Sequence, residues 1–320
     1  MEISERLSSI LLAPLAYLTT PASKTFYLYL ATSLLLALFL HAREARKLKQ
    51  PLDPLASIVP TKVYTHPSAM VDYIYFITNS IIYAAILAPF AAFGTWVSGS
   101  ILFGLNSIAT PHVMTDASAP LITAAFTIVI ALVADFGTFL THYWLHRYPI
   151  LWEFHKVHHS AEVLTPITVY RMHPLDDIIT LCVVGLLTGV TDALTRFFIT
   201  PAISPFVIAG LGLATFLFFV TGYHLRHSHI WLSYGPVWSK IFISPAQHQI
   251  HHSKARKHWD KNFGFIFSIW DYMYGSLYIP KERETIEFGI GNGEERDYSS
   301  PLHLYFVPFK KAWAILKSRR

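Results

Sequence analysis

Histidine clusters are the most distinctive chemical feature of this sequence. Twelve of its 17 histidines fall between positions 142 and 252, in four short clusters and one single position. Neutral imidazole is a ligand for iron, copper, nickel and zinc, so these residues predict a metal site. The predicted metal ligands are His142, His146, His155, His158, His159, His173, His224, His227, His229, His248, His251 and His252.

The spacing within the clusters predicts that several imidazoles share one helix face. Residues three and four positions apart are neighbours on a helix, with Cβ atoms about 5–6 Å apart. The HxxxH motif at 142–146 therefore presents two imidazoles to one point, and each HxxHH motif, at 155–159 and 248–252, presents three. One metal ion takes only about four to six ligands. A set of this size therefore suits two metal ions.

The elements that position the histidines are predicted to lie in a membrane. Hydrophobic residues make up 53% of the chain and charged residues only 14%, against about 25% charged residues in a soluble domain. A bilayer-spanning helix needs about 17–25 residues, and five segments are apolar enough to enter the bilayer. They are approximately Thr25–His41, Asp72–Trp96, Pro120–Thr141, Asp177–Val190 and Phe197–Tyr223, the last two joined by a tight hairpin around Thr191–Pro201.

The predicted fold class is accordingly an all-α integral membrane protein with about four to five transmembrane helices. Lys and Arg are enriched on the cytoplasmic side of membrane proteins. With five crossings, only Arg6, Lys24 and Arg196 lie on one side, and the other 22 of the 25 basic residues lie with the histidine clusters. We therefore expect a cytoplasmic helical cap that holds the histidines.

The chain is predicted to form a single membrane domain, residues 1–320. It would comprise N-terminal spans (1–119), a catalytic core with the histidine motifs (120–280) and a cytoplasmic tail (281–320). Its one cysteine, Cys182, excludes a disulfide framework and a cysteine-based zinc or iron–sulfur site. The net charge of +5 does not point to nucleic acid, because the basic residues flank apolar segments instead.

The motif order resembles the fatty-acid hydroxylase / sterol desaturase superfamily of membrane di-iron oxygenases. The resemblance covers about residues 134–280 and is carried by HYWLH, HKVHH, RMHP, LRHSHI and SPAQHQIHHS, and by the stretch from Asp260 to Gly275. It implies two iron ions held by the histidine motifs, O₂ as co-substrate, and a lipid substrate. Many relatives have asparagine at the position of His224.

The expected function is therefore O₂-dependent oxidation of an unactivated C–H bond in a lipid. A redox metal is needed for such chemistry, since side chains alone do not provide it. Asp135 is the predicted catalytic carboxylate: it lies seven residues before His142, on about the same helix face, and is expected to orient that imidazole through a hydrogen bond. Asp176 and Asp177 could act similarly, although capping of the helix that follows is a simpler role.

Electrons must come from another protein, since the sequence has no haem, flavin or CxxC motif. The predicted partner is a separate ferredoxin-like or b-type cytochrome donor. A basic stretch after the last histidine motif could dock an acidic donor or anionic lipid headgroups. It contains Lys254, Arg256, Lys257 and Lys261.

Several alternatives remain open from the sequence. Desaturation begins with the same hydrogen abstraction as hydroxylation, and sphingoid bases, fatty acyl chains, sterols, alkylglycerol ethers and carotenoids are all possible substrates. A zinc-dependent membrane hydrolase is a different class, although catalytic zinc usually keeps only three protein ligands. A histidine-rich metal transporter is a third, but transporter sites lie near the bilayer midplane rather than at span ends.

Overall fold

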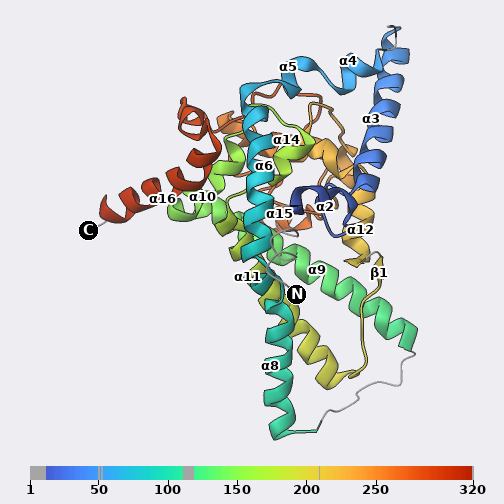
Figure 1. Ribbon diagram of the computed structural model, residues 1–320. Coiled ribbons are helices and arrows are strands. Elements are labelled where there is room, and N and C mark those ends of the chain that lie inside the picture. Colours follow the sequence, from blue (N-terminus) through green and yellow to red (C-terminus); the bar gives the residue numbers. More distant parts are fainter. Residues whose placement is uncertain (1–11, 50, 52, 111–118, 209, 319–320) are drawn as a thin grey trace.

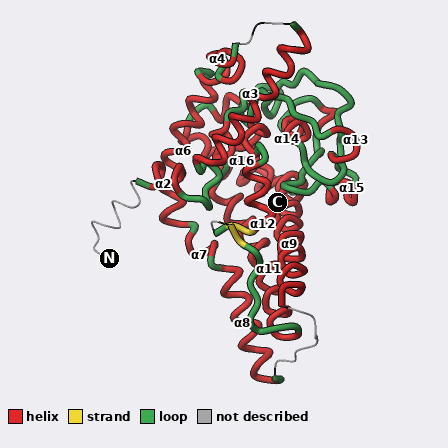
Figure 2. Tube along the Cα trace, turned by 90° about the vertical axis from the view of Figure 1, so that its right-hand side faces the viewer, coloured by secondary structure: helices red, strands yellow, loops and turns green. Residues whose placement is uncertain are grey.

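The computed structural model describes residues 12–49, 51, 53–110, 119–208 and 210–318, and helices dominate these residues (Figures 1 and 2). Three helices are long and apolar enough to cross a membrane: α3 (Tyr27–Leu48), α9 (Ala119–Arg147) and α11 (Pro174–Phe198). Only about a fifth of the residues in their apolar windows are buried in the isolated chain, as expected for surfaces that lipid covers.

The second predicted span is a broken helix rather than one continuous segment. It comprises α6 (Pro67–Ile86), α7 (Ala88–Ala91) and α8 (Phe93–Ile108). Pro89, which cannot donate a backbone hydrogen bond to the end of α6, lies in the short helix α7. The predicted end of this span at Trp96 is wrong, because α8 continues to Ile108 and packs along α11.

Glycines allow α8 and α11 to approach closely. A Cβ atom added at Gly185 would lie 3.0 Å from the backbone nitrogen of Gly94, and one at Gly189 would lie 2.5 Å from the Gly94 carbonyl oxygen. Small residues at such contacts are typical of helices packed in membranes. Figure 1 shows α8, α9 and α11 together at one end of the molecule.

The fifth predicted span is not a helix over its length. Helix α11 continues to Phe198, which removes the predicted hairpin around Thr191–Pro201. A two-stranded antiparallel hairpin follows, β1 (Val207–Ile208) and β2 (Leu211–Gly212), and then the short helix α12 (Leu213–Val220). Pro201 and Pro205 lack the N–H groups that a helix needs there, so the apolar composition alone misled the prediction.

Short helices gather at the end of α9 where that helix carries His142 and His146 (Figure 1). The helix α10 (Pro149–His159) follows α9 directly, and α14 (Pro245–His251) packs against the 3₁₀ helix η2 (Tyr223–His227). The other elements are α2 (Ala13–Thr19), α4 (Pro54–Ile58), α5 (Thr61–Tyr64), η1 (Pro166–Tyr170), α13 (Gly235–Trp238), η3 (Arg256–His258), α15 (Ile269–Tyr274), η4 (Glu294–Tyr298) and α16 (Pro301–Ser318).

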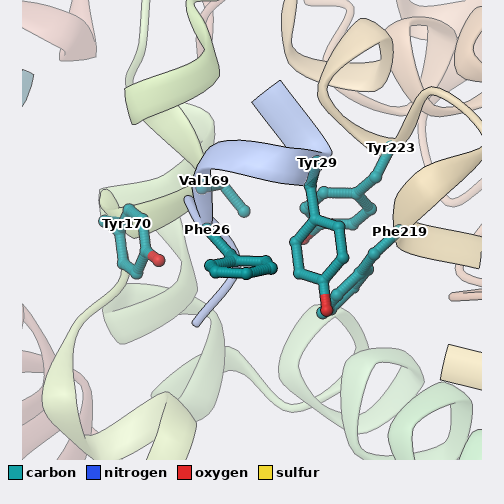
Figure 3. Close-up of a cluster of buried hydrophobic side chains, with 6 residues drawn as sticks. All are labelled: Phe26, Tyr29, Val169, Tyr170, Phe219 and Tyr223. Atoms are coloured by element: carbon teal, nitrogen blue, oxygen red, sulfur yellow. The ribbon is translucent and has the colours of Figure 1, made fainter. Parts of the chain in front are cut away.

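A buried aromatic cluster attaches the start of α3 to this histidine-bearing part (Figure 3). It consists of Phe26, Tyr29, Val169, Tyr170, Phe219 and Tyr223. Next to it, the His224 Nε2 atom donates to the Lys24 carbonyl oxygen at 2.8 Å. Lys24 was predicted to lie across the membrane from the histidines, and that placement is wrong. The aromatic packing of α3 against η1 and η2 brings Lys24 to the histidines instead.

Candidate metal centre

Nine of the predicted ligands come together in two groups. Within each group, one nitrogen from every histidine lies within 4.8 Å of the others. The groups are adjacent, since the ring centroids of His159 and His252 are 4.7 Å apart. The first group is His142, His146, His155, His159 and His251, and the second is His158, His227, His248 and His252.

Each HxxHH motif contributes to both groups. In α10, His155 and His159 are four residues apart and face the first group, whereas His158 faces the second. In the other motif, His251 joins the first group, and His248 and His252 join the second. Helix α9 supplies two ligands to the first group only, and η2 supplies one to the second. Two neighbouring helices thus serve two neighbouring sites.

A loop after the last motif orients two of the imidazoles. The His142 Nδ1 atom donates to the carbonyl oxygen of Phe263, and the His251 Nδ1 atom donates to that of Lys261, both at 2.8 Å. A proton on Nδ1 leaves Nε2 free as a metal ligand. The two backbone carbonyls therefore select the tautomer that a metal requires.

Two further imidazoles are oriented by residues after α10. The His155 Nδ1 atom donates to an oxygen of the buried Asp176 at 3.1 Å, and His158 Nδ1 donates to the Arg171 carbonyl oxygen at 3.2 Å. A carboxylate on the far nitrogen fixes the ring and makes the ligating nitrogen more basic. Asp176 therefore has the role that the sequence suggested for it as one of two possibilities.

The ring nitrogens of each group are arranged so that a metal ion fits among them. In the first group, all five Nε2 atoms are buried and have no hydrogen-bond partner among the described residues. In the second, successive Nε2 atoms are 3.4 Å (His158 to His227), 3.0 Å (His227 to His248) and 3.1 Å (His248 to His252) apart. Such separations match nitrogens that share one metal at about 2.1 Å.

Burial also keeps these imidazoles neutral. Desolvation disfavours the protonated form, so it lowers the pKa of each buried histidine well below 6.5. The lone pairs are then available to a metal at neutral pH. This lowering of the pKa by burial applies to the grouped histidines outside α9, which are His155, His158, His159, His227, His248, His251 and His252.

Three predicted ligands lie outside both groups. His173 caps α11: its Nδ1 accepts from the backbone N–H of Leu175 at 3.1 Å and its Nε2 donates to the Tyr305 carbonyl oxygen at 3.2 Å. His229 Nε2 donates to a backbone carbonyl at 2.7 Å, and His224 is held by the Lys24 contact described above. The prediction of these three as ligands is corrected, because none of them has a ring nitrogen within either group.

Asp135 does not contact His142. Its carboxylate accepts from the backbone N–H groups of Ile266 at 2.8 Å and Phe267 at 3.1 Å, and from Trp270 Nε1 at 2.9 Å. Seven helical residues rise about 10.5 Å, which is too far for a hydrogen bond between the two side chains. The predicted catalytic role is therefore corrected: Asp135 anchors the segment that follows Phe263.

Arg171 lies in the RMHP motif, but no role was predicted for it. This fully buried arginine pairs with Asp72 of α6 at 2.7 Å and donates through Nε to the Val157 carbonyl oxygen at 3.0 Å. Its own carbonyl oxygen accepts from His158. Arg171 thus connects α10, α6 and one metal-facing imidazole.

Comparison with known proteins identifies the histidine-bearing part of the chain. Residues 127–276 match the model of the fatty acid hydroxylase family. This segment is a fatty acid hydroxylase domain, which confirms the superfamily predicted from the histidine motifs.

The chain is similar to relatives with different named activities. The chain is 31% identical over 171 residues to an ornithine lipid hydroxylase of Rhizobium tropici, covering 52% of this chain and 46% of that protein. It is 26% identical over 182 residues to the alkylglycerol monooxygenase of Caenorhabditis elegans (57% and 32%) and 28% identical over 151 residues to a Delta(7)-sterol 5(6)-desaturase of Gibberella zeae (47% and 37%). The chain thus spans less than half the length of these curated relatives. No solved structure matches it.

Proposed function

We propose that this protein is a membrane di-iron oxidoreductase that uses O₂ to oxidise an unactivated C–H bond of a lipid. The observation that carries the proposal is the convergence of nine imidazoles in two adjacent groups. Bound iron would supply the redox chemistry that side chains lack. The protein residues would hold the two ions, keep the ligating nitrogens deprotonated and exclude water from a buried site.

Iron accounts for the ligand set better than zinc does. The two groups contain five and four imidazoles, and each number is larger than the three protein ligands that are usual for catalytic zinc. The relatives are named as a hydroxylase, a monooxygenase and a desaturase, and all three names denote oxidation. In hydroxylation, one oxygen atom of O₂ enters the C–H bond and the other becomes water, which consumes two electrons and two protons. Desaturation of the same substrate is the alternative.

We further propose that the histidine groups lie at the cytoplasmic face of the membrane. Helices α9 and α11 are long and apolar, and the end of α9 lies next to the start of α11. His142 and His146 lie in the last turns of α9, and Asp176 lies in the first turn of α11. A lipid would therefore reach the metals from the bilayer without leaving it completely.

An external electron donor would approach from the side opposite the lipid. A polar cavity of about 230 Å³ reaches His146, His159 and His251, and Trp152 and Trp259 line it. We propose a ferredoxin-like or b-type cytochrome donor at this face. The predicted basic docking stretch is partly neutralised here, since Lys254 forms an ion pair with Glu287 at 2.8 Å and Lys257 forms one with Glu284.

Metal analysis of the purified protein tests the proposal. We expect about two iron ions per chain, with a loss of iron in both His146→Ala, from the first group, and His252→Ala, from the second. His303→Ala is the matched control, because His303 is exposed and belongs to neither group.

Activity completes this test. Chelation should abolish oxygen-dependent lipid oxidation in a reconstituted system, and iron should restore it. A purified protein that holds zinc alone, or that modifies lipid without O₂, would exclude the di-iron oxidoreductase and favour the hydrolase class.

A further inference from the structure

Two cavities meet beside the metal groups. The inner one, of about 260 Å³, is lined by histidines of both groups and by Arg226. The outer one, of about 530 Å³, has mainly apolar walls from α2, α6 and α11. The two share four lining residues, which are Lys24, Val169, Met172 and Asp177. A chain-like molecule could therefore extend from the outer cavity to the metals.

Arg226 is the unexplained group in this arrangement. It is 4% exposed, and aromatic rings surround its guanidinium, with Phe218 at 5.2 Å, Phe265 at 5.4 Å and Tyr223 at 5.5 Å. Its Nη2 atom has no hydrogen-bond partner, and among the described residues no carboxylate lies within 4.0 Å of it. Aromatic faces compensate a buried cation only in part.

Arg171, the other buried arginine described above, has oxygen partners that Arg226 lacks. Arg171 has an aspartate at 2.7 Å and donates to four other oxygen-bearing residues. Where the two cavities meet, Lys24 and Asp177 both line them, and the Asp177 charge acts on the Lys24 ammonium. Arg226 has no carboxylate within 4.0 Å among the described residues, and Asp135, Tyr223 and Tyr234 act on its charge without forming an ion pair with it. An oxygen atom that enters the cavity would supply the partner that Nη2 lacks.

We propose that Arg226 binds an anionic or hydrogen-bond-accepting oxygen group at one end of the lipid, while the hydrocarbon chain runs past Lys24 and Asp177 into the outer cavity. This inference rests on the proposed function. It has a consequence for the position of reaction. Because the guanidinium and the metal-facing imidazoles line one small cavity, the oxidised carbon lies within a few bonds of the oxygen group.

Lipid binding without turnover tests the role of Arg226. The whole protein in lipid nanodiscs, without reductant, is titrated with radiolabelled hexadecanoate and with hexadecane, which has the same chain and no oxygen. We expect Arg226→Met to weaken hexadecanoate binding about ten- to a hundredfold and hexadecane binding by less than about twofold. Arg226→Lys should be intermediate, because it keeps the charge but not the planar donor pair. Arg283→Met, at an exposed arginine, is the control.

A purely structural role gives a different result. If Arg226 only stabilises η2, Arg226→Met lowers the thermal midpoint of the protein measured without either probe and weakens the binding of both probes together. On our proposal the midpoint holds or rises, because an unpaired buried charge is removed. Equal binding of hexadecanoate by wild type and Arg226→Met would overturn the proposal.

Product analysis separates this inference from the proposed function. Mass spectrometry of the oxidised acyl chain should place the new oxygen, or the new double bond, near the carboxyl end. Oxidation at mid-chain would overturn the binding arrangement and leave the proposed function intact. Arginine-dependent binding of hexadecanoate without any oxidation would support the site and count against the proposed function.

Discussion

At the scale of single residues, the hydrogen bond at one ring nitrogen of an imidazole determines whether the other ring nitrogen can bind a metal. Phe263, Lys261 and Arg171 provide backbone carbonyls for this purpose, and among these four described hydrogen bonds the one from His155 goes to a carboxylate. The carboxylate is therefore the one partner in this set that mutation can remove without a change of backbone.

Asp176→Ala should weaken iron binding about ten- to a hundredfold, since His155 would lose the group that fixes its ring. Iron affinity is measured by competition with a chelator. Asp192→Ala is the matched control: this aspartate lies in the same helix and accepts from Ser98 and Arg196, remote from the histidines. Equal iron affinity in the two variants would show that Asp176 does not support the metal.

At the scale of elements, the contact between α8 and α11 sets the position of the helix that supplies Asp176. The two backbones touch at Gly94, Gly185 and Gly189, where no side chain fits. Helix α9 also packs closely on α11, because a Cβ at Gly137 would lie 3.1 Å from Val184. The metal-facing ends of α9 and α11 are thus held together by contacts along the apolar part of both helices.

Gly189→Ala should destabilise the protein by about 1–3 kcal/mol, because its Cβ would lie 2.5 Å from the Gly94 carbonyl oxygen. Thermal unfolding in detergent measures the effect. Gly99→Ala, also in a helix, is the control: a Cβ there meets nothing within 4 Å, so helix propensity should leave stability unchanged or raise it by up to about 1 kcal/mol. A loss of stability in Gly99→Ala as large as in Gly189→Ala would contradict this account of the contact.

At the scale of the whole molecule, the histidine-bearing part and the far end of α8 lie at opposite ends (Figure 1). If α9 and α11 cross the bilayer, these two ends are exposed to different compartments. The topology is then tested by asking which end a reagent outside the cell can reach.

In a Cys182→Ser background, Ser107→Cys should react with a membrane-impermeant maleimide added to intact cells, and Ser299→Cys should react only after permeabilisation. Both serines are exposed, one near the end of α8 and the other between η4 and α16. Labelling of the two cysteines in the reverse order would place the histidines outside the cell and contradict the cytoplasmic assignment.

The sequence by itself determined the chemistry of the site and the superfamily. Imidazoles three and four residues apart share a helix face whatever the rest of the fold does, because helix geometry is local. The apolar segments at the three long helices were likewise evident, since burial in lipid is a property of composition. The apolar run after α11 was misleading because its prolines and glycines outweigh its hydrophobicity.

Only the tertiary structure decided how the histidines divide between the two groups. The division of HKVHH between the groups depends on where α9, α14 and η2 meet α10, which no spacing within the motif encodes. The carbonyls that orient His142 and His251 could not be predicted either, because every residue has a carbonyl and only tertiary packing brings a particular one to the imidazole. The same holds for the unpartnered Arg226: its charge can be read from the sequence, but its isolation results from long-range packing.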